Sequence, residues 1–168
     1  LAPSLGRGTF TLTTTSGDAG SGAVFFEGHE LAPADAGSRV RYFSVRGHTG
    51  PGGAVMIVGF VIRGEMPLRL LVRGLGPALA TVGAARSIAD QLLEIYAAGA
   101  PAPLVVNDNW SDNPDIADAT RRVQALPLTP GSRDAALLVT LASGAYTAVV
   151  AVTDSTSGTT QIEFHVLD

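Results

Sequence analysis

The feature of this chain that most constrains its fold is the apolar stretch 54–75, which reads AVMIVGFVIRGEMPLRLLVRGL. Its first arm, 54–62, is nine residues without a charged or polar side chain, and its second arm, 68–72, is interrupted only by Arg69. Short runs that are rich in Val and Ile are typical of strands buried on both faces. Because the polar turn 63–67 separates the two arms, the stretch predicts a β-hairpin at the centre of a sheet.

The composition favours a single globular domain. The 168 residues are 46% hydrophobic and 15% charged, which excludes a mostly disordered chain. The longest apolar run is less than half of the roughly 20 residues that a membrane-spanning helix needs, so we expect no transmembrane segment. The chain has no cysteine, which excludes disulfides and thiolate metal sites. Its net charge is −4 and its arginines are scattered, which argues against nucleic acid as a partner.

Short segments separated by turn residues follow one another along the rest of the chain. Residues 9–15 alternate strictly between apolar and polar side chains, a period of two that predicts a half-buried strand. In the last predicted strand, apolar residues alternate with Glu163 and His165, so we expect His165 to face solvent. The remaining predicted strands are 23–27, 39–46, 92–97, 104–107, 135–141, 146–152 and 159–167. Residues 84–98 also fit a helical pattern, and of the two alternatives we favour the strand over 92–97.

The sequence predicts one clear helix, 116–126, which Pro114 or Asp115 opens. Its acidic residues lie near the N-terminal end and Arg121 and Arg122 lie towards the other end, as the helix dipole favours. About ten short strands with one short helix predict an all-β fold, a two-sheet β-sandwich of jelly-roll type.

Several segments from Ser38 onward resemble a known kind of module. They read SRVRYFSVRG, VMIVGFVIRG, LRLLVRGLGPAL, LEIY, NDNWSD and LASGAYTAVVAV. Together they resemble a β-sandwich module of large secreted bacterial multidomain proteins, and the final third is similar to bacterial pre-peptidase C-terminal domains. The resemblance implies a sandwich domain over 38–168 and a secreted, extracellular or cell-surface location.

Residues 1–37 lie outside this resemblance and form a predicted N-terminal arm. Its strand, 9–15, places Phe10, Leu12 and Thr14 on one face, and a Gly/Ser-rich linker follows it. Such an extended segment can add to the unpaired edge of a sheet in another copy of the chain. Alternatively, the strand folds back onto its own sheet. The sequence leaves both arrangements open.

The polar loop 107–115 carries the candidate ligand-binding residues. Asp108, Asp112 and Asp115 offer oxygen ligands of the kind that Ca²⁺ prefers, and similar loops in the resembling domains sometimes hold calcium. The alternative is a set of Asx-turns around Trp110. The Trp110 ring itself is either a buried anchor of the loop or a platform for a glycan. No cofactor other than calcium is expected.

No constellation of catalytic residues is apparent in the sequence. It has no Gly-x-Ser-x-Gly motif, and His29, His48 and His165 are too scattered to form a metal motif. We therefore expect no enzyme. We expect a secreted structural subunit that self-assembles into an extracellular fibre or surface matrix by exchange of its N-terminal strand. The alternative is a carbohydrate- or calcium-binding accessory module of a larger exported protein.

Overall fold

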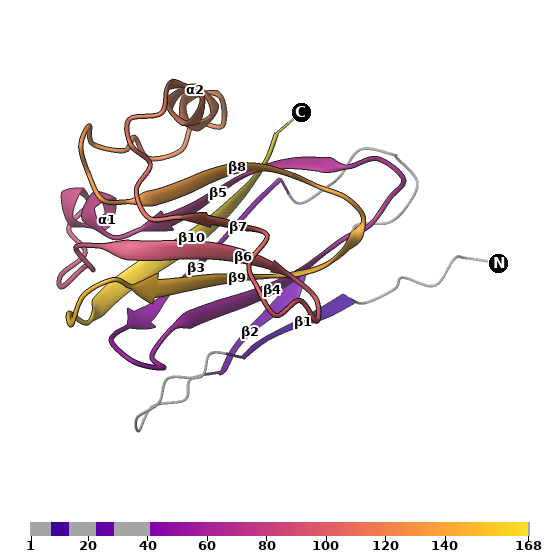
Figure 1. Ribbon diagram of the computed structural model, residues 1–168, viewed down its shortest axis with the longest axis horizontal. Coiled ribbons are helices and arrows are strands. Elements are labelled where there is room, and N and C mark those ends of the chain that lie inside the picture. Colours follow the sequence, from indigo (N-terminus) through magenta and orange to yellow (C-terminus); the bar gives the residue numbers. More distant parts are fainter. Residues whose placement is uncertain (1–7, 14–22, 29–40, 168) are drawn as a thin grey trace.

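The sandwich is built from eight strands in two four-stranded antiparallel sheets, with two short helices (Figure 1). This computed structural model describes the backbone of residues 8–13 and 23–28 and the whole of residues 41–167. The predicted all-β, two-sheet sandwich is confirmed. Within the described residues, neither helix has the length and apolar character that crossing a membrane would need.

The order of the strands is that of a jelly roll. The first sheet has the order β3-β10-β5-β8 and the second has the order β4-β9-β6-β7. Successive strands along the chain lie in opposite sheets, with the exception of β6 and β7, as in an eight-stranded jelly roll. The strands of the first sheet are β3 (Tyr42–Thr49), β5 (Leu68–Leu75), β8 (Ala135–Leu141) and β10 (Gly158–Leu167). Those of the second are β4 (Met56–Ile62), β6 (Gln91–Ala97), β7 (Val105–Asn107) and β9 (Gly144–Val152).

The predicted hairpin at 54–75 is wrong, because its two arms lie in different sheets. β4 is one of the two outermost strands of the second sheet and pairs with β9. One of its faces is turned to solvent, where Val61 is 60% exposed. β5 lies between β10 and β8 and is buried on both faces. β4 and β5 each contribute one apolar face to the shared core. Strands in two facing sheets therefore bury these apolar side chains as well as a hairpin would.

Two clusters of apolar side chains hold the layers together. The first fills the space between the sheets, where the rings of Phe43 and Phe164 stack with their centroids 4.4 Å apart. The second lies on the outer face of the first sheet, where helices α1 (Pro77–Thr81) and α2 (Pro114–Arg122) cover β5 and β8. This second layer explains why β5 is buried on both faces from Leu70 onward.

Helix α2 is shorter at its C-terminal end than the predicted helix 116–126. It begins after Asn113, whose side-chain oxygen accepts a hydrogen bond from the backbone N–H of Asp115 at 2.9 Å. It ends at Arg122, because Gln124 has a φ of 55° and therefore leaves the right-handed helical conformation.

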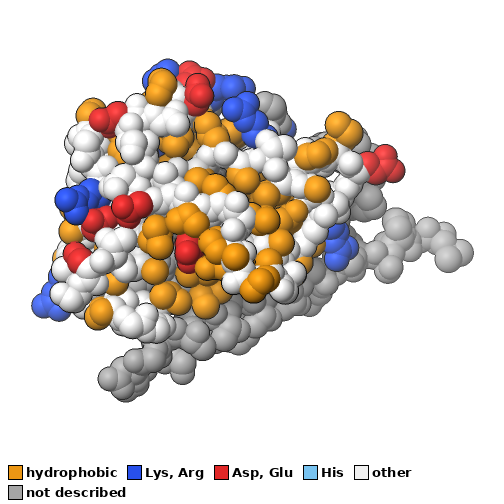
Figure 2. Space-filling model, viewed as in Figure 1, with side chains coloured by type: hydrophobic (Ala, Val, Ile, Leu, Met, Phe, Trp, Pro, Cys, Tyr) orange, Lys and Arg blue, Asp and Glu red, His pale blue; other side chains and the backbone are white. Residues whose placement is uncertain are grey.

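The outer face of the second sheet carries no helix within the described residues. We call this surface the apolar face, and Figure 2 shows hydrophobic side chains gathered over β4, β6 and β9. Glu94 is the charged residue among its outward positions, and Tyr96 donates a hydrogen bond to it at 3.0 Å. The other outward positions include Ile57, Val61, Leu92, Val106, Thr147 and Val149.

The N-terminal arm contains a separate two-stranded sheet. Strand β1 (Gly8–Thr13) pairs antiparallel with β2 (Ala23–Gly28), so that Phe10 lies opposite Phe26 and Leu12 lies opposite Val24. β1 lies beside β4, at the edge of the sandwich (Figure 1). Within the described residues, β1 therefore pairs with β2, the second strand of the arm, and joins neither large sheet. Thr14 lies outside the described residues.

We predict that Gly76→Ala destabilises the domain by about 2 kcal/mol or more. A Cβ atom at Gly76 would overlap the side-chain oxygen of Gln91 and the backbone oxygen of Ile88, which cannot move aside easily. Gly59→Ala on β4 is the matched control, because a Cβ atom there meets nothing within 4 Å. Removing a strand glycine at that open position should leave stability unchanged or raise it by up to about 1 kcal/mol. Thermal unfolding of both variants tests this, and equal losses would contradict it.

Candidate functional site

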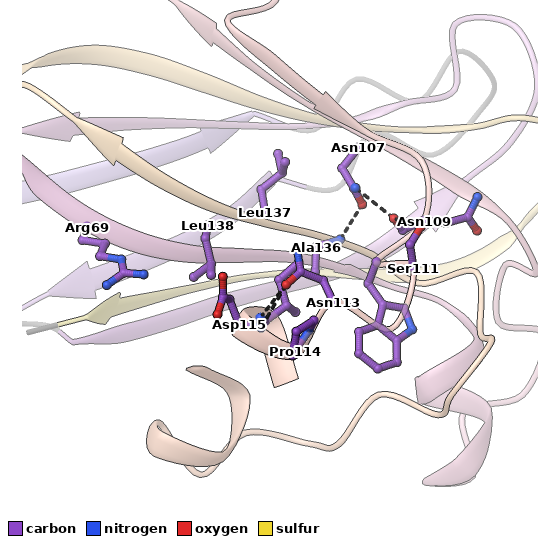
Figure 3. Close-up of a pocket in the computed structure, with 12 residues that line it drawn as sticks. Arg69, Asn107, Asn109, Ser111, Asn113, Pro114, Asp115, Ala136, Leu137 and Leu138 are labelled. Atoms are coloured by element: carbon purple, nitrogen blue, oxygen red, sulfur yellow. Dashed lines mark hydrogen bonds between the residues drawn. The ribbon is translucent and has the colours of Figure 1, made fainter. Parts of the chain in front are cut away.

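A groove of about 690 Å³ lies along the outer edge of β8 (Figure 3). The 107–113 loop and the start of α2 form one wall, and β8 with Arg69 of β5 forms the other. Its lining combines side-chain amides, one carboxylate, one guanidinium and the apolar side chains of β8. The volume lies within the range of about 300–1,000 Å³ that is usual for ligand sites.

The 107–113 loop is held against the beginning of β8 by hydrogen bonds. The side chain of Asn107 accepts one from the backbone N–H of Ala136 and donates one to the backbone oxygen of Asn109, both at 2.9 Å. The backbone N–H of Trp110 donates to the backbone oxygen of Asp134, also at 2.9 Å. The loop therefore takes the place of a neighbouring strand over 134–136.

Trp110 anchors this loop in the second apolar cluster. Its side chain is only 5% exposed, and its indole N–H donates to the Ser132 hydroxyl at 3.1 Å. Ser132 in turn donates to the buried carboxylate of Asp134, which accepts hydrogen bonds from the backbone N–H groups of Gly76 and Ala78 at the start of α1. A stacked sugar needs an exposed ring face, so this burial favours the anchoring role of Trp110 over the platform.

The structure does not bring the three predicted calcium ligands together. Asp108 accepts a hydrogen bond from the side chain of Asn109 at 3.1 Å, and Asp112 accepts one from the backbone N–H of Gly131 at 2.8 Å. Asp115 occupies the first turn of α2 and lines the groove. Across the described ranges, no group of three or more His, Asp or Glu side chains is arranged to hold a metal ion.

Beyond the loop, the edge of β8 pairs with no strand of the described ranges. Backbone groups of alternate residues in an edge strand point the same way. The N–H of Ala136 and the oxygen of Asp134 point away from β5, so the backbone groups of Leu138 and Thr140 do too. In the part of the chain that the structure describes, the N–H groups of these two residues have no hydrogen-bond partner. The groove is therefore bordered by a β edge that has no strand partner among residues 8–13, 23–28 and 41–167.

The expectation that His165 faces solvent is wrong, and the reason is a cluster of charges that the sequence did not indicate. His165 is 5% exposed and its Nε2 lies 3.2 Å from the carboxylate of Glu163. Arg73, which is completely buried on β5, forms an ion pair with the same carboxylate and also donates to the backbone oxygen of Leu126 at 2.6 Å. The cluster could have been found only from the position of Glu163 directly opposite Arg73 in the neighbouring strand. That pairing depends on a strand register that cannot be read from the sequence.

The remaining partners of the Glu163 carboxylate come from β3 and β10. Gln161 donates to its Oε1 at 2.6 Å and Tyr42 donates at 3.4 Å, while Arg46 donates to the side-chain oxygen of Gln161 at 2.8 Å. Burial raises the pKa of Glu163, but the hydrogen bond from His165 and the charge and hydrogen bonds of Arg73 outweigh it. Together they lower the pKa to about 2. The carboxylate is thus a charged, fully bonded member of the sheet.

We predict that Glu163→Gln costs about 3–5 kcal/mol of stability, because it leaves the buried charge of Arg73 without its partner. The double variant Arg73→Met with Glu163→Met removes both charges and should lose less than Glu163→Gln alone. Chemical denaturation of wild type, Arg73→Met, Glu163→Met and the double variant gives the coupling energy. Losses that simply add would show that the pair is not coupled.

We also predict a specific loss of stability in acid. Since the pKa of Glu163 is about 2 in the folded chain against a usual value of 4.5, the unfolded chain binds a proton first as the pH falls. The contribution is complete above about pH 4.5 and is lost between that pH and 2, on the order of 3 kcal/mol. The difference in urea stability between wild type and Glu163→Gln should shrink over this window. A constant difference would refute the assignment.

Comparisons with known proteins add no family to this geometry. No protein-family model matches the chain, and no curated protein matches it. The chain is therefore identified by its structure alone, as a two-sheet antiparallel β-sandwich domain.

Proposed function

We propose that the chain is a secreted structural subunit that self-assembles into an extracellular fibre or surface matrix through its N-terminal arm. The observation that carries this proposal is the position of the β1–β2 hairpin, which lies outside a jelly roll that is complete without it. The sandwich has its own core between its two sheets, to which all eight of its strands contribute side chains. The arm is therefore not needed to close the fold.

The hairpin itself needs a surface to pack against. An isolated two-stranded sheet is marginally stable at best in water. Within one molecule β1 lies beside β4, one of the two outermost strands of the second sheet. In an assembly, the sandwich of a neighbouring copy would receive the arm, and the arm would exchange one packing partner for another.

Two further features support an assembling, extracellular role. The apolar face is uncharged apart from Glu94, and exposed apolar surfaces of this kind often mark interaction sites. The resemblance of residues 38–168 to sandwich modules of secreted bacterial proteins and to pre-peptidase C-terminal domains favours export. The expected partner is another copy of the chain.

A carbohydrate-binding accessory module is the second candidate, and the groove favours it. Asn107, Asn109 and Asn113 line the groove together with Asp115 and Arg69, and such polar groups can hydrogen-bond sugar hydroxyls. Glycan-array binding that disappears on Asn109→Ala would support this candidate over the structural subunit.

We predict that deletion of residues 1–37 leaves a folded sandwich that no longer assembles. The melting temperature should change by only a few degrees, since the core lies in the remaining strands, and sedimentation should show a monomer. Electron microscopy of the full chain should show fibres or a matrix. The variant Phe10→Ser with Leu12→Ser keeps the arm but removes the two apolar side chains of β1, and it should also fail to assemble. A truncated chain that assembles as well as the full chain would overturn the proposal.

A further inference from the structure

We propose that the open edge of β8 is the acceptor for strand β1 of a second copy. This inference rests on the proposed function, because it names the surface that receives the arm. Addition of a strand to an exposed sheet edge gains affinity from backbone hydrogen bonds, and the side chains of alternate residues supply specificity.

Among the described residues, the edge lacks backbone partners over a defined length. The loop covers 134–136 through Asn107 and Trp110, so the backbone groups without a partner in the described ranges begin at Leu138. Leu138 and Thr140 together offer two N–H donors and two carbonyl acceptors that point away from β5. An added strand would extend the first sheet beyond β8 and lie in the groove between β8 and the start of α2.

The chemistry of β1 suits this position. Its sequence, GTFTLT, has no charge and no proline, so every residue can pair with the edge. The groove offers the half-buried side chain of Leu138 to an apolar residue of the added strand and the side-chain amides of the loop to its threonines. β1 carries both kinds of side chain, since Phe10 and Leu12 lie between threonines.

The geometry favours another copy of the chain as the source of the strand. β4 and β7 are the two outermost strands of the second sheet, and the arm lies beside β4 whereas β8 lies beside β7. The arm and the acceptor edge are thus on opposite sides of the sandwich (Figure 1). Contacts between different surfaces of identical subunits produce rings if the rotation closes and open filaments if it does not. A fibre requires the open arrangement.

Thr140→Pro in the full chain tests the acceptor directly. Proline removes the outward N–H of Thr140, which is exposed, and is tolerated where that N–H is not bonded within the sheet. His48→Pro is the matched control, since His48 is exposed on β3, the opposite edge of the same sheet, and its N–H points away from β10. We expect Thr140→Pro to raise the concentration for half-assembly about tenfold or more, and His48→Pro to change it less than about twofold.

Cysteine cross-linking gives an independent readout, because the chain contains no cysteine of its own. A mixture of full chains carrying Thr11→Cys and full chains carrying Thr140→Cys should form disulfide-linked pairs under mild oxidation. A mixture with His48→Cys in place of Thr140→Cys should not. This measurement also decides the matter if Thr140→Pro fails to fold.

The outcomes separate this inference from the proposed function. If the full chain assembles and the 1–37 deletion does not, but Thr140→Pro assembles normally and the Thr140→Cys pairs do not form, the acceptor is elsewhere and this inference is overturned alone. If the full chain remains monomeric at all concentrations, both are overturned. Cross-links at Thr140 together with weakened assembly of Thr140→Pro would establish the β8 edge as the acceptor.

Discussion

The packing of the helical layer on the outer face of the first sheet depends on the ion pair between Arg73 and Glu163. β5 is covered on both faces, so an arginine at its middle must be neutralised and fully bonded where it lies. Glu163 on β10 supplies the charge, and the backbone oxygen of Leu126 accepts a further hydrogen bond. Since Leu126 follows α2, the same guanidinium fixes the segment after the helix to the sheet.

The class of the fold could be predicted from the sequence, whereas the pairing of its strands could not. Period-two alternation and short apolar runs mark strands whatever their neighbours, and the segments 92–97 and 135–141 were located almost to the residue. The stretch 54–75 misled because an apolar strand and a polar turn are equally compatible with a hairpin and with a crossing between sheets. Only the jelly-roll order, which depends on contacts far apart in the chain, decides between them.

The candidate site was predictable in part, for a related reason. The sequence shows that the loop 107–115 is polar, and a buried Trp110 is one of the two roles that it predicts for that residue. Alternation indicated that Glu163 and His165 share a face of their strand, but not that the side chains of Arg73 and Tyr42 from the two neighbouring strands cover it. The open edge of β8 is invisible in sequence, because it arises where the loop held by Asn107 stops covering the strand.

The placement of the arm and the β8 edge on opposite sides of one sandwich has a consequence for growth. A single molecule does not offer its own arm to its own β8 edge without carrying it across the domain. A polymer of such subunits would have polarity, with a free arm at one terminus and a vacant edge at the other. Each terminus could then be blocked separately, by a chain that keeps the edge and lacks the arm or by a chain that keeps the arm and lacks the edge.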